Sequence, residues 1–123
     1  SILLSKASTN NISNYHVLII NKIGILSRIY RYADINYVGG GFNNGIHNIL
    51  EPAVYNKPVL FGPNFRKFTE AHELIDNNLA ISIKDKNEFI SAIKYFECKD
   101  ITQTSKKYFI SKKGASKIIL DKI

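Results

Sequence analysis

Short apolar runs alternate with helical patterns along the chain. Four runs have the length and composition of β-strands, and they span residues 15–20 (YHVLII), 35–38 (INYV), 58–61 (PVLF) and 79–83 (LAISI). Between and after them, apolar residues recur at spacings of three and four, which predicts amphipathic helices. This order is typical of βαβ units, so we predict an α/β fold with a parallel sheet and helices on both faces.

The helical spacing predicts three amphipathic helices and a basic C-terminal helical stretch. Their apolar faces comprise Ile25, Leu26, Ile29 and Tyr30 in the first helix, Phe68, Ala71, Leu74 and Ile75 in the second, and Phe89, Ile90, Ile93 and Phe96 in the third. Asp85 and Glu88 form a capping-box pattern that opens the third helix. In the C-terminal stretch, Gly114 is expected to end one helix and separate it from another.

The stretch YVGGGFNNGIHNILEP, residues 37–52, combines a glycine-rich loop with a predicted helix start. In doubly wound sheets ligands bind beyond the carboxyl ends of the strands, so the loops after Ile20, Val38 and Phe61 are expected to share one rim. Three consecutive glycines allow backbone angles closed to other residues and let a ligand approach the main chain. The stretch is therefore a candidate ligand loop, with Gly40 and Gly41 at its centre.

The second half of that stretch has the signals of a helix N-terminus. Asn48 is a good N-cap, Glu51 three residues later completes an N-x-x-E pattern, and Pro52 is tolerated only in the first turn. Free N–H groups at such an end attract phosphate, carboxylate or ribose oxygens, and the adjacent His47 could donate to a phosphate. The alternative is that the glycines serve close packing and Glu51 only caps, because the loop matches neither the P-loop nor the dinucleotide fingerprint.

Composition limits the class of protein. With 123 residues and 45% hydrophobic content, the chain is one domain's worth of an ordinary globular fold. Its single cysteine, Cys98, allows no internal disulfide, so a cytosolic setting is the default. The apolar runs fall far short of the ~20 residues that a membrane span needs, so we expect a soluble chain.

The net charge of +7 favours anionic partners such as nucleic acid, phosphorylated ligands or an acidic membrane surface. Many lysines lie late in the chain, including Lys106, Lys107, Lys112, Lys113 and Lys117. Their spacing suits solvated helix faces as well as a binding patch. Charge alone does not choose among these partners.

Other chemistry finds little support in the sequence. His16, His47, His72 and Cys98 fit no zinc spacing, and no G-x-S-x-G nucleophile elbow is present. The tyrosines occur at helix and strand spacings, which is more typical of partly buried core than of base stacking. We therefore expect no metal and no cofactor.

Two segments carry a resemblance to a known family. The segment DINYVGGGFNNGIHNILEPAVYNKPVLFGPNFRKFTEA resembles the core of the C-terminal domain of the 3-deoxy-D-manno-octulosonic acid (Kdo) transferases. Their usual pattern runs A-D-x-x-[FY]-[VI]-G-G-[SG], then G-x-H-N-x-L-E, P-V-[LI]-F-G-P and a Lys/Asn-Phe-x-E segment. Upstream, VLIINKIGILSRIYRYAD is similar to the family's strand, D-T-x-G-x-L turn and following helix. The resemblance covers about Val17 to Ile83.

The resemblance implies a GT-B glycosyltransferase, in which two Rossmann-like domains face each other across a cleft. In that family the C-terminal domain holds the donor CMP-Kdo, and the N-terminal domain holds the lipid A precursor (lipid IVA) of lipopolysaccharide biosynthesis. By implication CMP is held here by the turn and helix-start residues Ile23, Gly24, Ile25, Asn48, Ile49, Leu50 and Glu51. The implied setting of the full-length enzyme is the cytoplasmic face of the inner membrane.

The chain also departs from the family pattern. Ile25 and Leu26 offer no carboxylate where the family often has one, so a contact from position 25 would be through the main chain, and Asn21 replaces the usual Asp. Residues 1–123 are too few for two Rossmann-like domains. We therefore interpret them as part of the donor-binding domain, with the N-terminal acceptor domain and its general base absent, and expect this fragment alone to be inactive.

A second interpretation remains open on the residues alone. The chain could be a non-catalytic basic α/β module that binds an anionic polymer or RNA, whereas the transferase interpretation expects no nucleic acid as a partner.

Overall fold

The computed structural model describes the backbone of residues 1–121 and the side chains of residues 1–113. Its strands are β1 (Ile2–Leu3), β2 (Leu18–Ile19), β3 (Asn36–Val38), β4 (Val59–Phe61) and β5 (Ala80–Ser82). Its α-helices are α1 (Leu26–Ile29), α2 (Leu50–Ala53), α3 (Thr69–Asp76), α4 (Lys86–Glu97) and α5 (Thr102–Asp121). Single 3₁₀ turns form η1 (Leu4–Lys6), η2 (Ile12–Asn14) and η3 (Tyr30–Tyr32).

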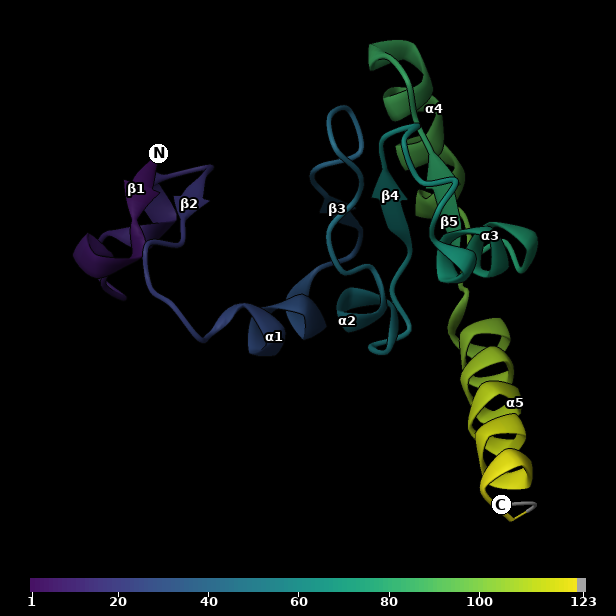
Figure 1. Cartoon of the computed structure of the whole chain (residues 1–123). Coiled ribbons are helices and arrows are strands. Elements are labelled where there is room, and N and C mark those ends of the chain that lie inside the picture. The colour runs from purple at the N-terminus through teal and green to yellow at the C-terminus, as the bar shows by residue number, and fades with distance from the viewer. Residues whose placement is uncertain (122–123) are drawn as a thin grey trace.

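The strands form two separate parallel sheets. One has the order β3-β4-β5 and the other pairs β1 with β2. Figure 1 shows the β1–β2 pair apart from β3, while β4 and β5 lie on the other side of β3. The expectation of one sheet that includes residues 15–20 is therefore wrong for this chain. Only Leu18–Ile19 of that run is a strand, and its loop does not share the rim of the three-stranded sheet.

The β3-β4-β5 sheet is covered on both faces, as the sequence predicts. All three residues of the central strand β4 are fully buried, at 0% exposed. Val59 and Phe61 belong to one apolar cluster, which includes Leu74 of α3. Leu60 belongs to a second cluster, which includes Phe96 of α4. Successive side chains of a strand point to opposite faces, so each face of the sheet has its own helical cover.

The predicted amphipathic helices form, with differences in detail. In α3, Ala71 and Leu74 are buried, as expected. The Asp85 side chain accepts a hydrogen bond from the Glu88 N–H at 2.8 Å, which confirms the N-cap of α4. The inward position predicted for Ile90 is wrong, because this residue is 40% exposed and the buried side of the helix is defined by Ala92 and Phe96. The first predicted helix is one turn, α1, followed by η3, and its predicted inward face is wrong at Leu26, which is 53% exposed.

The basic C-terminal stretch is one helix rather than two. The backbone of α5 continues through Gly114 to Asp121, and Figure 1 shows an uninterrupted coil. A glycine within a helix costs ~1 kcal/mol relative to alanine but does not force a break. The expected division at Gly114 is therefore wrong. Among the described helices, none is both long and apolar enough to cross a membrane.

An ion pair holds α5 to α3. The Lys112 ammonium lies 2.7 Å from the Glu73 carboxylate, and the Tyr108 hydroxyl donates to the same carboxylate at 2.6 Å. The hydrogen bond from Lys112, followed by the one from Tyr108, lowers the pKa of Glu73. The same bond to Glu73 raises the pKa of Lys112. Lys112 is therefore a structural contact between two helices.

Candidate functional site

The glycine-rich loop after β3 packs backbone against backbone on the loop after β4. A Cβ atom added to Gly41 would lie 2.5 Å from the Gly62 N atom, and one added to Gly62 would lie 2.6 Å from the Gly41 carbonyl carbon. Both distances are far below van der Waals contact. These two glycines are therefore required by the packing of the two loops, as the alternative interpretation proposed.

The loop is also shaped by its own hydrogen bonds. The Gly40 carbonyl accepts from the N–H groups of Asn43 and Gly45, both at 3.1 Å. Gly40 has a φ of +90°, and a Cβ there would approach the Gly45 carbonyl oxygen to 2.3 Å and the His47 ring to 3.2 Å. Because both the backbone angle and the space exclude a side chain, Gly40 has a structural reason to be glycine.

Asn64 ties the two loops together. Its N–H donates to the Gly41 carbonyl at 2.8 Å, and its side-chain amide donates to the Asn43 carbonyl. His47 follows directly, with its N–H bound to the Gly39 carbonyl at 3.1 Å. These hydrogen bonds therefore fix the position of the segment that begins at His47 relative to the two loops.

The N-cap position of α2 is Ile49, so the prediction of Asn48 as the N-cap is wrong, but Asn48 still contacts the start of the helix. Its side-chain oxygen accepts from the Leu50 N–H at 3.0 Å, and α2 begins at Leu50. No hydrogen bond joins Glu51 to Asn48 in the described part of the chain, so the reciprocal half of the box does not form. Pro52 lies within the first turn, as predicted. With four residues, α2 has only a small helix dipole.

A pocket of about 360 Å³ opens at this segment. Its volume is at the lower end of the usual range for small-molecule sites, which is ~300–1,000 Å³. The pocket brings together four residues that the sequence predicts for ligand binding and three that it does not. Its lining residues are Ile46, His47, Asn48, Ile49, Leu50, Phe68 and Glu70.

Glu51 lies beside this pocket but is not part of its lining. Its side chain is exposed, and its charge acts on Tyr30, which follows α1 and begins η3. Burial raises the pKa of Tyr30, and the negative charge of Glu51 raises it further. The Glu51 carboxylate therefore acts on the Tyr30 side of α2 and is accessible to solvent.

The turn residues predicted for nucleotide binding lie elsewhere. Ile23 is fully exposed, and Gly24 has a φ of +90° in open space, where an added Cβ would have no neighbouring atom within 4 Å. No hydrogen bond joins residues 23–25 to residues 47–51 in the described chain. The structure therefore brings His47, Asn48, Ile49 and Leu50 into one pocket and leaves the turn at residues 23–25 apart from them.

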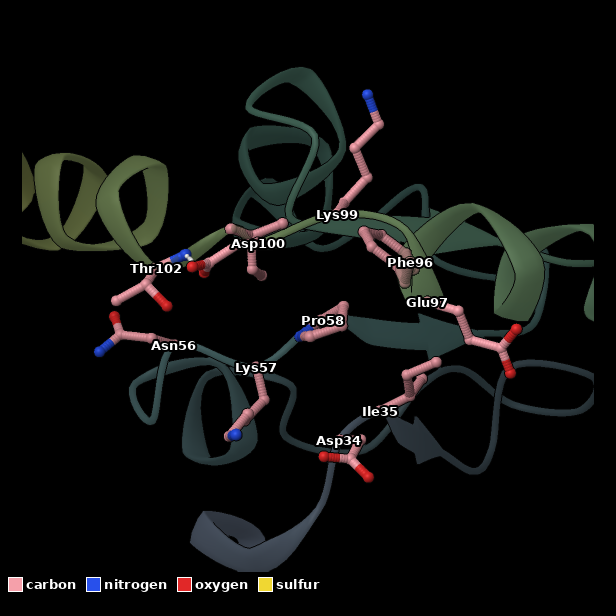
Figure 2. Close-up of a pocket in the computed structure, with 11 residues that line it drawn as sticks. Asp34, Ile35, Asn56, Lys57, Pro58, Phe96, Glu97, Lys99, Asp100 and Thr102 are labelled. Carbon is pink, nitrogen blue, oxygen red and sulfur yellow. Dashed lines mark hydrogen bonds between the residues drawn. The ribbon is translucent and has the colours of Figure 1, made fainter.

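A larger hollow of about 650 Å³ lies at the opposite end of the sheet, and Figure 2 shows its lining. It borders Pro58, which precedes β4, and the α4–α5 connection around Asp100. Hydrogen bonds from Thr102 lower the pKa of Asp100, and the charge of Lys57 contributes less. Ligands of parallel α/β sheets bind at the carboxyl ends of the strands, so this hollow at the amino end is the weaker candidate.

Sequence reasoning missed Ile46, Phe68 and Glu70 as pocket residues. The sequence pattern assigns Phe68 to the apolar face of α3, but its ring instead lies over Gly45, where a Cβ would meet it at 3.1 Å. The Phe-x-Glu pair is part of the family pattern, and that was the available signal. In the described residues, no group of three or more His, Cys, Asp or Glu side chains is arranged to hold a metal ion.

Comparison with known proteins gives specific matches. The chain is 32% identical over 96 residues to the 3-deoxy-D-manno-octulosonic acid transferase of Rickettsia typhi, and the match covers 75% of this chain and 21% of the relative. It is 33% identical over 84 residues to a bifunctional glycosyltransferase/methyltransferase of Fusobacterium nucleatum, where the match covers 67% of this chain and 13% of the relative. No protein-family model matches the chain.

A solved structure matches as well. The C-terminal CMP-Kdo binding domain of WaaA from Acinetobacter baumannii aligns with a TM-score of 0.65 and 28% identity, covering 76% of this chain and 52% of the solved chain. The chain therefore spans about a fifth or less of the curated relatives above and about half of the solved domain. By sequence and by fold, the chain is a homologue of the 3-deoxy-D-manno-octulosonic acid transferases and matches part of their C-terminal domain.

Proposed function

We propose that this chain forms part of the CMP-Kdo site of a Kdo transferase, with the segment His47–Glu51 at its centre. The observation that carries the proposal is the pocket at this segment, in a chain whose fold matches a solved CMP-Kdo binding domain. The pocket lies at the carboxyl-end side of the sheet, where ligands of parallel α/β folds bind.

The chemistry of the segment suits a nucleoside monophosphate. Asn48 already occupies the Leu50 N–H, so the N–H groups of Ile49 and Glu51 are the backbone donors for phosphate oxygens. The exposed Glu51 carboxylate can accept hydrogen bonds from ribose hydroxyls. Because α2 has only four residues, individual N–H groups rather than a helix dipole would hold the phosphate. The main chain of residues 23–25 would contribute only after the turn moves toward the pocket.

In the full-length enzyme, a hydroxyl of the lipid A precursor would attack the anomeric carbon of Kdo as the bond to the CMP phosphate breaks. The proton would pass to a general base outside this chain. No cofactor is needed in this scheme, since hydrogen-bond donors can stabilise the leaving CMP phosphate. Purified chain of 123 residues should therefore transfer no Kdo, and detectable transfer would contradict this division of labour.

We also propose that the full-length enzyme works at the cytoplasmic face of the inner membrane, with α5 toward anionic lipid. Lys106, Lys107 and Lys113 are exposed on α5, whereas Lys112 is paired with Glu73, and the side chain of Lys117 lies outside the described residues. Each exposed lysine near such a surface contributes ~1 kcal/mol. Co-sedimentation with vesicles should increase with phosphatidylglycerol content and decrease with salt. Binding that ignores both variables would contradict this orientation.

The test of the donor site is the CMP affinity of Glu51→Gln in the full-length enzyme. Loss of a charge-assisted hydrogen bond worth ~1.5–3 kcal/mol lowers donor affinity by roughly 10- to 100-fold. Wild-type affinity in a variant with an unchanged melting temperature would remove Glu51 from the site.

Asn48→Ala is the reference for stability only, because Asn48 itself lines the pocket; losing its hydrogen bond to the Leu50 N–H should cost ~1 kcal/mol of stability. Single-stranded RNA is the competing ligand in the same assay. Strongly salt-dependent RNA binding without any CMP binding would favour a basic RNA-binding module instead.

A further inference from the structure

The pocket beside α2 has walls from two segments that are distant in sequence. One wall is the run of residues 46–50, and the other is the start of α3, with Phe68 and Glu70. The nucleotide contacts proposed above all come from residues 47–51. The wall at α3 therefore has no part in them, although it lines the same pocket.

The carboxylate of Glu70 is an acceptor without a partner in the described part of the chain. Glu70 is half-buried in the first turn of α3, and no hydrogen bond or ion pair among the described residues involves its side chain. Glu73, one turn later on the same helix, is by contrast paired with Lys112. An ionised carboxylate has only acceptor positions, so a ligand in this pocket should offer hydrogen-bond donors to Glu70.

The Phe68 ring forms the apolar part of the same wall. It lies over Gly45, where an added Cβ would be 3.1 Å from the ring, and it is still 37% exposed. The ring is therefore held by the glycine-rich loop while part of it stays open to the pocket. An aromatic ring beside a carboxylate offers apolar area for the C–H face of a sugar and an acceptor for its hydroxyl groups.

The charge of Glu70 decides which part of the donor fits beside it. Two negative groups repel each other strongly in a pocket that partly excludes water, so the CMP phosphate is disfavoured next to this carboxylate. The hydroxyl groups of the Kdo moiety are neutral and can donate hydrogen bonds to it. For the same reason, the Kdo carboxylate is expected on the side of the sugar that faces away from Glu70.

The two sides of α2 match the two groups that the phosphate joins. The Glu51 carboxylate, which is the proposed ribose contact, acts on the Tyr30 side of α2 and lies outside the pocket. In Figure 1, α1 and α3 appear on opposite sides of α2. The phosphate of CMP-Kdo links the ribose to the Kdo moiety. With the phosphate at the N–H groups of Ile49 and Glu51, and the ribose on the Tyr30 side, the Kdo moiety extends toward the pocket.

We propose that Glu70 determines the sugar specificity of the donor site, with its carboxylate accepting hydrogen bonds from Kdo hydroxyl groups and the Phe68 ring packed against the C–H face of the sugar. This inference rests on the proposed function, which places the nucleotide at residues 47–51. A site built to hydrogen-bond a substrate hydroxyl rejects a sugar that lacks it, because the polar group of the site then stays unpaired. The nucleotide itself makes no contact with Glu70.

The first test compares CMP and CMP-Kdo on Glu70→Gln in the full-length enzyme. The kcat/KM for CMP-Kdo should fall by roughly 10- to 100-fold, as for a lost charge-assisted hydrogen bond, while inhibition by CMP stays at the wild-type value. Asp76→Asn is the matched control, since it removes one negative charge from the exposed last residue of the same helix and should change neither value. Glu51→Gln should weaken the binding of both compounds.

Two results with Glu70→Gln would overturn the inference. Equal weakening of CMP and CMP-Kdo would assign Glu70 to the nucleotide or to folding, and unchanged values for both would remove it from the donor site. A wild-type enzyme that binds no CMP would overturn the proposed function and this inference with it. Normal CMP binding separates the two, because the inference then fails or holds on the CMP-Kdo values alone.

The second test uses CMP-Kdo analogues in which one Kdo hydroxyl at a time is replaced by hydrogen. At least one analogue should react more slowly than CMP-Kdo with the wild-type enzyme and show no further loss with Glu70→Gln, because the variant no longer uses that hydroxyl. Losses that are the same in the two backgrounds for every analogue would overturn the inference.

Discussion

Residues 34–113 and residues 1–33 show how differently similar sequence patterns can fold. In the first region, the apolar strand β4 has all three residues fully buried between two helical layers. In the second, the apolar run of residues 15–20 contains a similarly short strand, β2, whose Leu18 and Ile19 are exposed. Val17 in the same run is 56% exposed.

The difference lies in the neighbours. β4 has a hydrogen-bonded strand on each side and a helix on each face, all within the chain. β2 has only β1 as a paired strand among the described residues. An apolar run is buried only when other elements cover it, because the hydrophobic effect is proportional to the apolar area removed from water. The apolar run of residues 15–20 is therefore exposed because few elements of the described chain pack against it.

The largest expected effect contrasts one leucine from each region. Leu60→Ala should lower the free energy of unfolding by ~2–5 kcal/mol, because it removes a fully buried side chain and leaves a cavity. Leu18→Ala, at a side chain that is 39% exposed, should cost well under half of that. Urea denaturation followed by circular dichroism measures both variants.

If Leu60→Ala and Leu18→Ala lowered the free energy of unfolding equally, the comparison would fail, since β2 would then be packed as tightly as β4 in solution. A smaller loss for Leu60 than for Leu18 would reverse it. In either case, the burial seen in the two regions would not describe their energetics.

A smaller effect is expected from glycines that share the same backbone angle. Gly24 and Gly40 both have a φ of +90°, but only Gly40 has close neighbours. Gly24→Ala should cost ~1–2 kcal/mol for the left-handed conformation alone. Gly40→Ala should cost a further ~1–3 kcal/mol, because its Cβ would overlap the Gly45 carbonyl oxygen. Thermal and urea unfolding of the two variants give the difference, and identical costs would argue that the loop after β3 relaxes freely.

The smallest expected effect concerns the ion pair between α3 and α5. Glu73→Gln should cost ~0.2–1 kcal/mol at neutral pH, because both side chains of the Glu73–Lys112 pair are 39% exposed and solvent screens them. Residues 1–33 contain no ion pair among the described contacts, so this term acts only in the larger region.

The pH dependence of this pair has a defined sign. The pKa of Glu73 in the folded chain is below its ordinary value of 4.5. The stabilisation by its carboxylate is therefore complete above pH 4.5 and is lost as the pH falls through the lowered pKa. The pKa of Lys112 is raised above 10.5, so its contribution is present below that pH and is lost as the pH rises through the raised value. The stability difference between wild type and Glu73→Gln should therefore shrink below pH 4.5 and above pH 10.5. A difference that stays constant in acid would contradict the pairing.

Much of the larger region could be predicted from sequence because its signals are local and agree with one another. The runs at 35–38, 58–61 and 79–83 each contain an observed strand, and the patterns around Leu74 and Phe96 predict the helix faces that cover them. Asp85 caps α4 as its spacing indicates. The sequence predicts binding at Asn48, Ile49, Leu50 and Glu51, with His47 beside them. Of these five residues, all except Glu51 line one pocket, and their binding role stays a prediction.

Other features depend on contacts between residues distant in sequence. Gly41 and Gly62 require each other's lack of a side chain, and nothing within either loop reveals this. Phe68 and Glu70 join the pocket because the chain at the start of α3 returns to the loop after β3. Asn48 accepts the Leu50 N–H while Glu51 makes no such bond, and this too depends on where α2 begins.

The sequence by itself determined the α/β class, the strands of residues 34–113 and the buried positions of Leu74 and Phe96 in the covering helices, and it indicated the segment in which the pocket lies. These follow from hydrophobic periodicity and capping, which act over a few residues. Only the tertiary structure decided that residues 15–20 would leave the main sheet, that α5 would continue through Gly114 and that Lys112 would pair with Glu73. The physical reason is that strand pairing, helix continuation and ion pairing are settled by the partners that the rest of the fold brings within reach.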